Sequence, residues 1–272
     1  YKNDRPKLIN IFDNTLGKGQ IFFGKNLTNF EKNFKKKYKS KYGIAVGSGT
    51  DALLISLMSL GLKKGDEVIT AANTAIPTIS AIVNSGATPK LVDVNADYLI
   101  DAKKIEKAIT KKTRVIIPVH LYGKPCDMST ILKISNKYNI KIVEDCAQAQ
   151  GAKFKNKFVG TFGEVGCFSL HPLKSLGAAG DGGFIVTKNK KLYEKFLRLR
   201  NHGQGRRKNG KYLKSRYDID YFGFCTRLDN LQASIVNTKL KILKKNISLR
   251  NKIAKDYNKA FENLPIIPPK IY

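Results

Sequence analysis

Three short segments of the chain contain residue types that could act together in catalysis. The first is the glycine-rich turn Gly47-Ser-Gly49-Thr-Asp-Ala52, which follows a predicted strand and opens a predicted helix. The N-terminus of a helix presents free N–H groups and the positive end of the helix dipole to an anion. Ser48, Gly49 and Thr50 could therefore hold a phosphate. The alternative is an ordinary turn in which Thr50 or Asp51 caps the helix.

The same turn matches G-x-G-x-x-A, a pattern typical of dinucleotide-binding sites. Such a site also needs an acidic residue about 20 positions later, at the end of the second strand. Here the second strand ends in Thr70-Ala-Ala-Asn73, and its acidic residue, Glu67, stands at the beginning. The sequence therefore disfavours a dinucleotide site and leaves a phosphate site open.

The second segment is Val143-Glu-Asp145-Cys-Ala-Gln148, in which Asp145 comes where a buried-looking strand ends. Ligands of parallel sheets bind at the carboxyl edge of the strands, so this position could serve a site. A buried carboxylate is costly unless a cation pairs with it. The alternatives to a site are a helix cap and a structural salt bridge.

The third segment, Phe168–Gly183, contains Lys174 among apolar residues and glycines, with few charged neighbours. It could be one more exposed loop lysine. One cofactor, pyridoxal phosphate, would nevertheless use all three segments. Its aldehyde forms an imine with a lysine, its phosphate suits a glycine-rich helix start, and its pyridine nitrogen stays protonated beside a buried aspartate.

Four segments together resemble the DegT/DnrJ/EryC1/StrS family of sugar aminotransferases that use pyridoxal phosphate. They are Gly47–Leu53, Glu144–Gly151, Ser169–Gly183 and Arg227–Ala233, and their order and spacing match from about Gly24 onward. The resemblance implies the α/β fold of the aspartate aminotransferase class, fold type I. In that fold a mostly parallel or mixed central sheet is flanked by helices.

The resemblance also implies a role for each matching residue. Lys174 would form the imine with the cofactor and then act as acid and base. Asp145 would pair with the pyridinium nitrogen, and Gln148 would hydrogen-bond the 3-oxygen of the ring. Gly49, Thr50 and Ser169 would hold the phosphate. His171 would face the substrate or the rim of the phosphate site.

By the same resemblance, the function expected is transfer of an amino group from L-glutamate to a nucleotide-linked keto sugar, for surface polysaccharide or other amino-sugar biosynthesis. The loop Leu176–Gly183 resembles members that act on 3-keto sugars more than those that act on 4-keto sugars. A related 3-dehydratase has histidine in place of the lysine, so Lys174 disfavours it. The family also implies a homodimer with sites at the subunit interface.

Two positions depart from the family pattern. Ala75 stands where an aromatic ring usually stacks on the cofactor. Cys225 stands where an asparagine often reaches the phosphate of the neighbouring subunit. These departures favour either a subgroup with different stacking or, as the alternative function, a degenerate or sensor-like protein without transaminase activity.

Predicted helices and strands alternate along the chain, which favours an α/β fold with a mostly parallel sheet. Thr28-Asn-Phe-Glu31 is a predicted capping box, and 228–264 reads as one long helix. We expect a large cofactor-binding domain with an N-terminal arm over 1–235. Residues 236–272 would be an interdomain helix and the start of a small C-terminal domain that is largely missing. The other predicted helices are 28–41, 49–60, 77–84, 101–110, 127–138 and 189–199, and the strands are 43–46, 67–70, 90–94, 114–120, 141–145 and 183–187, with hairpins over 151–170.

The composition and charge of the chain do not indicate a nucleic-acid-binding protein. The 272 residues are 42% hydrophobic and carry a formal net charge of +29, with 9 arginines among the 50 basic residues. Nucleic-acid sites favour arginine and aromatic residues on a defined groove element, so we interpret the dispersed lysines as a solvated surface without a specific nucleic-acid partner.

The cysteines and the apolar runs bear on compartment. Four cysteines form no C-x-x-C motif and no Cys/His cluster, which favours free thiols, no metal site and a reducing compartment. Apolar runs stay far below the ~20 residues of a membrane span, and the polar, basic start is unlike a secretory signal. We therefore expect a cytoplasmic protein, of which this chain, starting at Tyr1, is a fragment.

Overall fold

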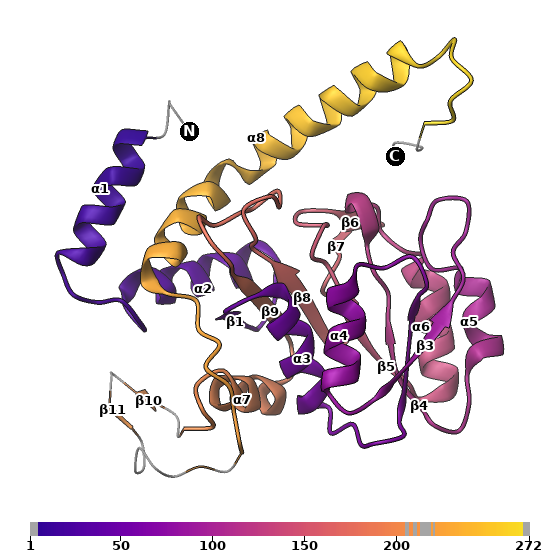
Figure 1. Ribbon diagram of the computed structural model, residues 1–272, viewed down its shortest axis with the longest axis horizontal. Helices are drawn as coiled ribbons and strands as arrows, with labels where there is room; N and C mark the ends of the chain where they lie inside the picture. Colours follow the sequence, from indigo (N-terminus) through magenta and orange to yellow (C-terminus); the bar gives the residue numbers. More distant parts are fainter. Residues whose placement is uncertain (1–4, 205–206, 209–210, 213–218, 220, 269–272) are drawn as a thin grey trace.

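A seven-stranded mixed sheet forms the centre of the chain, in the order β1-β9-β8-β5-β4-β2-β3 (Figure 1). The computed structural model describes residues 5–204, 207–208, 211–212, 219 and 221–268. Strand β9 runs antiparallel to both of its neighbours, whereas the pairs from β8 to β3 are parallel. The strands are β1 (Tyr42–Val46), β2 (Glu67–Ala71), β3 (Thr88–Val92), β4 (Thr113–Ile117), β5 (Lys141–Asp145), β8 (Val165–Ser169) and β9 (Gly183–Thr187).

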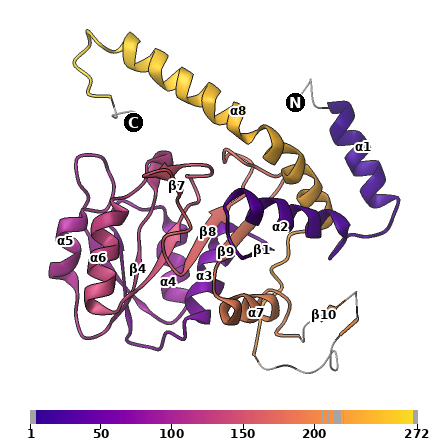
Figure 2. The ribbon, with the colours of Figure 1, turned by 180° about the vertical axis from the view of Figure 1, so that it is seen from behind.

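Helices cover both faces of this sheet (Figures 1 and 2). Side chains of successive strand residues point to opposite faces. In β1, Ile44 therefore joins the core that contains α3, α6 and α7, and Ala45 joins the core that contains α2 and α8. The helices are α1 (Arg5–Leu16), α2 (Lys25–Lys37), α3 (Gly49–Ser59), α4 (Ile76–Asn84), α5 (Ala102–Ala108), α6 (Met128–Tyr138), α7 (Lys190–Leu199) and α8 (Asn230–Ala260).

Helix α8 is attached to the sheet only along its first part. Its buried side chains lie between Asn230 and Leu243, and several of them pack with aromatic residues of α2 and of the sheet. Beyond Ile247 the helix runs on past the body of the protein, as Figure 1 shows in yellow. The anchored part of α8 therefore provides a fixed base next to α2 and to the loop that joins β8 to β9.

The predicted alternation of helices and strands is confirmed, with small differences in bounds. Two elements differ from the expectation: no helix was predicted over α1, and β8, expected within the hairpins of 151–170, is a central strand parallel to β5. The hairpin expected after β5 consists of β6 (Lys153–Phe154) and β7 (Lys157–Phe158), and a second short pair is β10 (Arg207–Lys208) with β11 (Lys211–Tyr212). A 3₁₀ turn, η2, spans Leu121–Gly123. Among the described residues, no helix combines the length and the apolar character that a membrane crossing requires.

The predicted capping box at Thr28 is wrong. Helix α2 already begins at Lys25, and its N-cap is Gly24, which has no side chain to signal a helix start. Glu31 is used elsewhere: its Oε1 accepts a hydrogen bond from the amide of Ala45 at 3.0 Å and pairs with Arg200 Nη1 at 2.6 Å. The acidic residue therefore ties α2 to the sheet rather than capping the helix.

Candidate active site

The predicted site residues come together at one edge of the sheet. Strands β1, β5 and β8 point the same way, because β9 is antiparallel to both β1 and β8, and β5 is parallel to β8. Each of the three segments found in the sequence includes or directly follows the end of one of these strands. The seven predicted residues therefore lie at or after the carboxyl ends of three strands of one sheet, namely Gly49, Thr50, Asp145, Gln148, Ser169, His171 and Lys174.

The glycine-rich turn lies directly against the end of β8. A Cβ atom added to Gly49 would stand 2.7 Å from Ser169 Cβ, so only glycine allows this approach. The helix is capped by Ser48, whose Oγ accepts from the amide of Asp51 at 3.0 Å. The alternative caps considered from the sequence, Thr50 and Asp51, do not fill that role.

This turn leaves donors at the start of α3. The first helical hydrogen bond runs from the amide of Ala52 to Ser48 O at 3.1 Å, and the amides of Gly49 and Thr50 come before it. Such first-turn amides have no partner within their own helix. Together with the Ser169 hydroxyl they form a set of donors of the kind that holds a phosphate.

Asp145 ends β5 as a buried carboxylate, with only 4% of its surface exposed. Its Oδ1 accepts from the amide of Ala147 at 3.0 Å and its Oδ2 from Thr78 Oγ1 at 2.9 Å. Burial raises the pKa of this carboxyl, and these hydrogen bonds lower it in part. Within the described part of the chain no cation lies within 4 Å of it, which argues against the salt-bridge alternative.

Lys174 lies in the loop after β8 and is half-buried. Its amide donates to His171 O at 2.9 Å, which folds the loop back on itself. The positive charge of Lys174 lowers the pKa of Asp145, against the larger effect of burial, so the two groups are within electrostatic reach of each other. The lysine and the aspartate therefore serve the same edge of the sheet.

Gln148 and His171 are each held by hydrogen bonds that do not use their Nε2 atoms. Gln148 Oε1 accepts from the amide of Tyr122 at 2.9 Å, which leaves the Nε2 group as a donor. His171 Nδ1 accepts from the amide of Leu173 at 3.3 Å, and its own amide donates to Ser169 Oγ at 3.3 Å. His171 is exposed, as a residue that faces a substrate would be.

Two buried side chains at this edge were missed in the sequence. Thr78 is 1% exposed and joins Asp145 to Thr74, whose Oγ1 lies 2.8 Å from Thr78 Oγ1. Gln150 Nε2 donates to Ser169 O at 2.5 Å and to Ala147 O at 3.2 Å, and so links the ends of β8 and β5. Thr78 stands three positions after Ala75, and a threonine so close to the position of the family's aromatic ring was the available signal.

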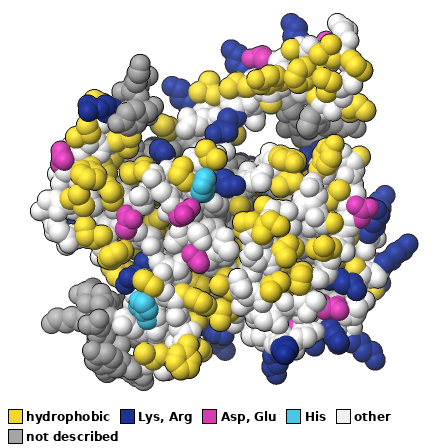
Figure 3. All heavy atoms as spheres, in the orientation of Figure 1, with side chains coloured by type: hydrophobic (Ala, Val, Ile, Leu, Met, Phe, Trp, Pro, Cys, Tyr) yellow, Lys and Arg dark blue, Asp and Glu magenta, His cyan; other side chains and the backbone are white. Residues whose placement is uncertain are grey.

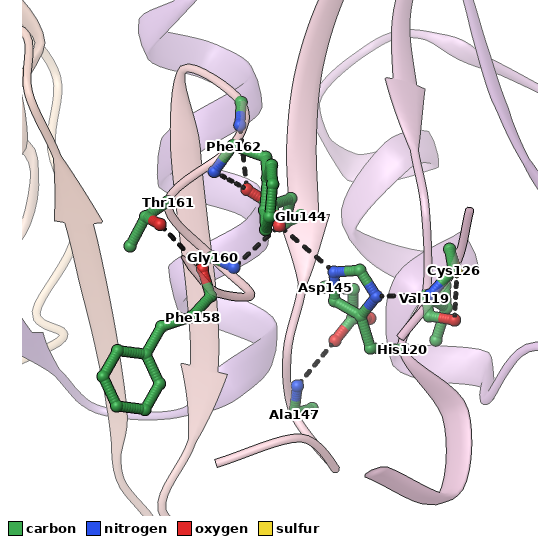
Figure 4. A network of polar contacts seen from close by, with 11 residues as sticks. Val119, His120, Cys126, Glu144, Asp145, Ala147, Phe158, Gly160, Thr161 and Phe162 are labelled. Carbon is green, nitrogen blue, oxygen red and sulfur yellow. Dashed lines mark hydrogen bonds and ion pairs between the residues drawn. The ribbon is translucent and has the colours of Figure 1, made fainter. Parts of the chain in front are cut away.

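Glu144, next to Asp145, points into a separate buried network (Figure 4). Its carboxylate accepts from the amides of Gly160, Phe162 and Gly163 at 2.7 to 2.8 Å, and His120 Nε2 lies 3.2 Å from its Oε2. A carboxylate filled by these donors has a structural role and offers little to a metal ion.

Cys146 lies close to this network and is chemically quiet. Its sulfur atom, His120 and Glu144 place possible ligand atoms within 4.8 Å of one another. Burial raises the pKa of the Cys146 thiol to about 12, so it remains protonated at neutral pH and is a poor nucleophile. The cluster therefore has a structural role beside β5 and is separate from the site at the carboxyl edge.

The two departures from the family pattern lie at the surface. Ala75 is exposed and caps α4, next to Ile76. Cys225 is exposed, and its Sγ lies 3.0 Å from Arg227 Nη2. On the face drawn in Figure 3, lysine and arginine side chains are scattered rather than gathered in one stripe. This distribution agrees with a solvated basic surface.

Comparisons with known proteins give a consistent result. The model of the DegT/DnrJ/EryC1/StrS aminotransferase family matches residues 3–271. Over 198 residues the chain is 45% identical to UDP-N-acetyl-3-dehydro-alpha-D-glucosamine 3-aminotransferase of Acidithiobacillus ferrooxidans, covering 72% of this chain and 51% of that protein. The chain thus spans about half the length of this curated relative.

Two crystal structures resemble the whole chain. DesV from S. venezuelae, in complex with a ketimine intermediate, has a TM-score of 0.92 at 34% identity. The match covers 100% of this chain and 72% of the DesV chain. NtdA from Bacillus subtilis, with its bound cofactor PMP, has a TM-score of 0.88 at 36% identity. The match covers 97% of this chain and 59% of the NtdA chain. The expected fold class is confirmed, and the cofactor bound in such structures is the one expected from the sequence.

Proposed function

The chain belongs to the DegT/DnrJ/EryC1/StrS aminotransferase family, and we propose that it moves an amino group from L-glutamate to a nucleotide-linked 3-keto sugar. One observation supports this most directly. Lys174, the buried Asp145 and the Gly49–Ser169 contact lie at one sheet edge, although Gly49 precedes Asp145 by about a hundred residues in the sequence. This is the set of groups that an enzyme using pyridoxal phosphate needs.

The residues present fit that cofactor. The buried carboxylate of Asp145 has no cation partner within 4 Å among the described residues, and a pyridinium nitrogen would supply one. The open amides at Gly49 and Thr50 and the Ser169 hydroxyl suit a phosphate, and the Nε2 group of Gln148 suits a ring oxygen. When bound, the cofactor supplies an electron sink for the carbon that loses a proton.

Lys174 is the proposed acid and base. Its Nζ would take the proton from the α-carbon of the donor and return a proton during transfer to the acceptor. A group that takes up a proton in this way acts as a general base, and one that returns it acts as a general acid. Asp145 would keep a proton on the pyridine nitrogen, while Thr78 Oγ1 and the amide of Ala147 hold its carboxylate in one orientation.

The acceptor is proposed to be a sugar with its ketone at carbon 3. The Acidithiobacillus ferrooxidans relative is named for such a 3-dehydro sugar. His171, exposed beside Ser169 and three positions before Lys174, would contact the sugar or the rim of the phosphate site. The net charge of +29 would attract the diphosphate of a nucleotide sugar toward the protein. The product would serve surface polysaccharide or other amino-sugar biosynthesis.

A homodimer is part of this proposal. Large apolar side chains lie exposed around the site edge: Ile76 by 74%, Tyr122 by 71% and Leu173 by 81%. Exposed apolar groups of this size gather where a protein binds a partner. A second copy that covers them would also complete the site. Residues 1–235 would form the cofactor-binding domain, and α8 would lead toward a smaller second domain.

The test is to locate the lysine that holds the cofactor. Borohydride treatment of protein loaded with pyridoxal phosphate, followed by peptide mapping, should place the pyridoxyl group on Lys174. Lys174→Ala should lose the label and the formation of 2-oxoglutarate from L-glutamate, whereas exposed Lys188→Ala should keep both. A label on another lysine would refute the site. Labelling without 2-oxoglutarate would favour a sensor-like protein.

A further inference from the structure

The loop that contains Lys174 is a compact unit with a closed base. The amide of Leu170 donates to Gly182 O at 2.7 Å, and the amide of Ala178 donates to Leu170 O at 2.7 Å. Inside the loop, a Cβ atom at Gly177 would lie 2.4 Å from Pro172 O, so the two halves touch. These internal contacts hold the two halves of the loop together.

Two side chains of α8 reach the outer half of this loop. Gln232 Oε1 accepts from the amide of Ala179 at 2.8 Å, and Lys239 Nζ donates to Gly177 O at 2.7 Å. The two residues are seven positions apart, about two helical turns, and so lie on the same side of α8. Both are half-buried, which distinguishes Lys239 from the exposed lysines that follow it.

The helix that provides these contacts is itself firmly held at this end. Asp229 Oδ1 caps α8 by accepting from the amide of Gln232 at 2.7 Å. Asn230 Oδ1 accepts from the amide of Leu27 at 3.0 Å, and Ala233 and Val236 are fully buried in the core beneath. The contacts from α8 to the loop therefore start from a rigid base.

We propose that Gln232 and Lys239 are positioning residues that clamp the Lys174 loop against α8. The clamp fixes the outer half of the loop through one backbone amide and one backbone carbonyl, so Lys174 keeps its place relative to Asp145. A charged amine on a carbonyl makes a stronger hydrogen bond than a neutral pair, so Lys239 contributes more than Gln232. This inference rests on the proposed function only in giving Lys174 its chemical role.

Hydrogen exchange of the cofactor-free full chain tests the clamp directly. Amides of residues 170–182 should exchange about tenfold faster in Lys239→Met and severalfold faster in Gln232→Leu, since a lost bond to a charged donor costs more. Lys241→Met, on the same helix but exposed, removes the same charge and should leave these amides unchanged. Lys239→Arg and Gln232→Glu keep a donor and an acceptor, and should restore most of the protection.

A second measurement separates positioning from general loss of stability. With pyridoxal phosphate bound, the pH midpoint of the cofactor's absorbance change should shift in Lys239→Met and return toward the wild-type value in Lys239→Arg. Lys241→Met should keep the wild-type midpoint. If Gln232→Leu fails to fold, the comparison of Lys239→Met with Lys241→Met still decides.

The outcomes distinguish this inference from the proposed function. Unchanged exchange and an unchanged midpoint in Lys239→Met, in a chain whose wild type is labelled at Lys174, would overturn the clamp and leave the proposed function intact. Absence of label at Lys174 in the wild type would overturn the proposed function, and the exchange rates of the cofactor-free chain would still decide whether the clamp exists.

Discussion

At the scale of single residues, Asp145 shows how a site is prepared at a cost to the fold. Burial raises the pKa of its carboxyl, so the folded chain binds this proton more readily than the unfolded chain. Its contribution to stability is therefore present below the unfolded pKa and is lost as the pH rises through the folded pKa. Above its folded pKa the ionised carboxylate therefore weakens the cofactor-free fold.

We therefore expect Asp145→Asn to raise the melting temperature of the cofactor-free protein at neutral pH and to lose that gain under strongly acidic conditions. Transamination should fall at least about a hundredfold, because the ring nitrogen loses its anionic partner. Thermal unfolding across a pH series measures the first effect. Asp93→Asn is the control, since Lys104 lowers the pKa of that exposed carboxyl and its removal should give no gain. A lower melting temperature for Asp145→Asn at neutral pH would contradict this account.

Residue types alone could predict part of the site. Lys174, Asp145 and the turn at Gly49 stood out because their chemistry contrasts with their neighbours in the sequence. Thr78 and Gln150 did not, because they act through partners 67 and 19 residues away and their types are common everywhere. Contacts of this kind depend on which strand ends become neighbours, and a sequence without a sheet order does not contain that information.

At the scale of elements, the turn from β1 into α3 joins local folding to ligand binding. Ser48 Oγ caps the helix through the amide of Asp51, and Asp51 Oδ2 in turn accepts from Ser48 Oγ at 2.8 Å and from Thr226 Oγ1 at 2.7 Å. The cap therefore also fixes the segment 226–229 that leads into α8. The sequence predicted the helix start but gave the cap to Thr50 or Asp51, because Ser48 competes with two equally good capping types.

We expect Ser48→Ala to lower the free energy of unfolding by about 1 kcal/mol and to weaken cofactor binding, because the first turn of α3 loses its anchor. Asn189→Ala removes the equivalent cap of α7, in which Asn189 Oδ1 accepts from the amide of Leu192 at 3.2 Å. Asn189 follows β9, which runs antiparallel to β8 and therefore ends at the sheet edge opposite the site. Urea unfolding should show a similar loss for both variants. Titration with pyridoxal phosphate should show weaker binding for Ser48→Ala alone, and equal weakening in both would show that the α3 cap has no special part in binding.

At the scale of the whole molecule, one face of the sheet is covered by helices, whereas its carboxyl edge is exposed. On one face, α2 and the first part of α8 bury a cluster of aromatic rings in which Phe34 stacks on Phe184 with centroids 4.1 Å apart. The carboxyl edge instead leaves large apolar side chains in contact with solvent. The family resemblance implied a mixed sheet flanked by helices but not the order of its strands, and which side chains remain uncovered depends on packing and became visible only in the structure.

The uncovered edge leads to a prediction about assembly. Ile76 is exposed by 74% at the start of α4, beside the site, and a dimer that covers it would bury most of this side chain. Ile76→Glu should therefore shift the protein from dimer to monomer in sedimentation and should reduce transamination in parallel, because the partner completes the site. Leu91→Glu is the matched control, since Leu91 is also exposed, by 54%, but lies on β3 at the far end of the sheet. A monomeric wild type with full activity, or loss of the dimer in Leu91→Glu alone, would place the partner surface elsewhere.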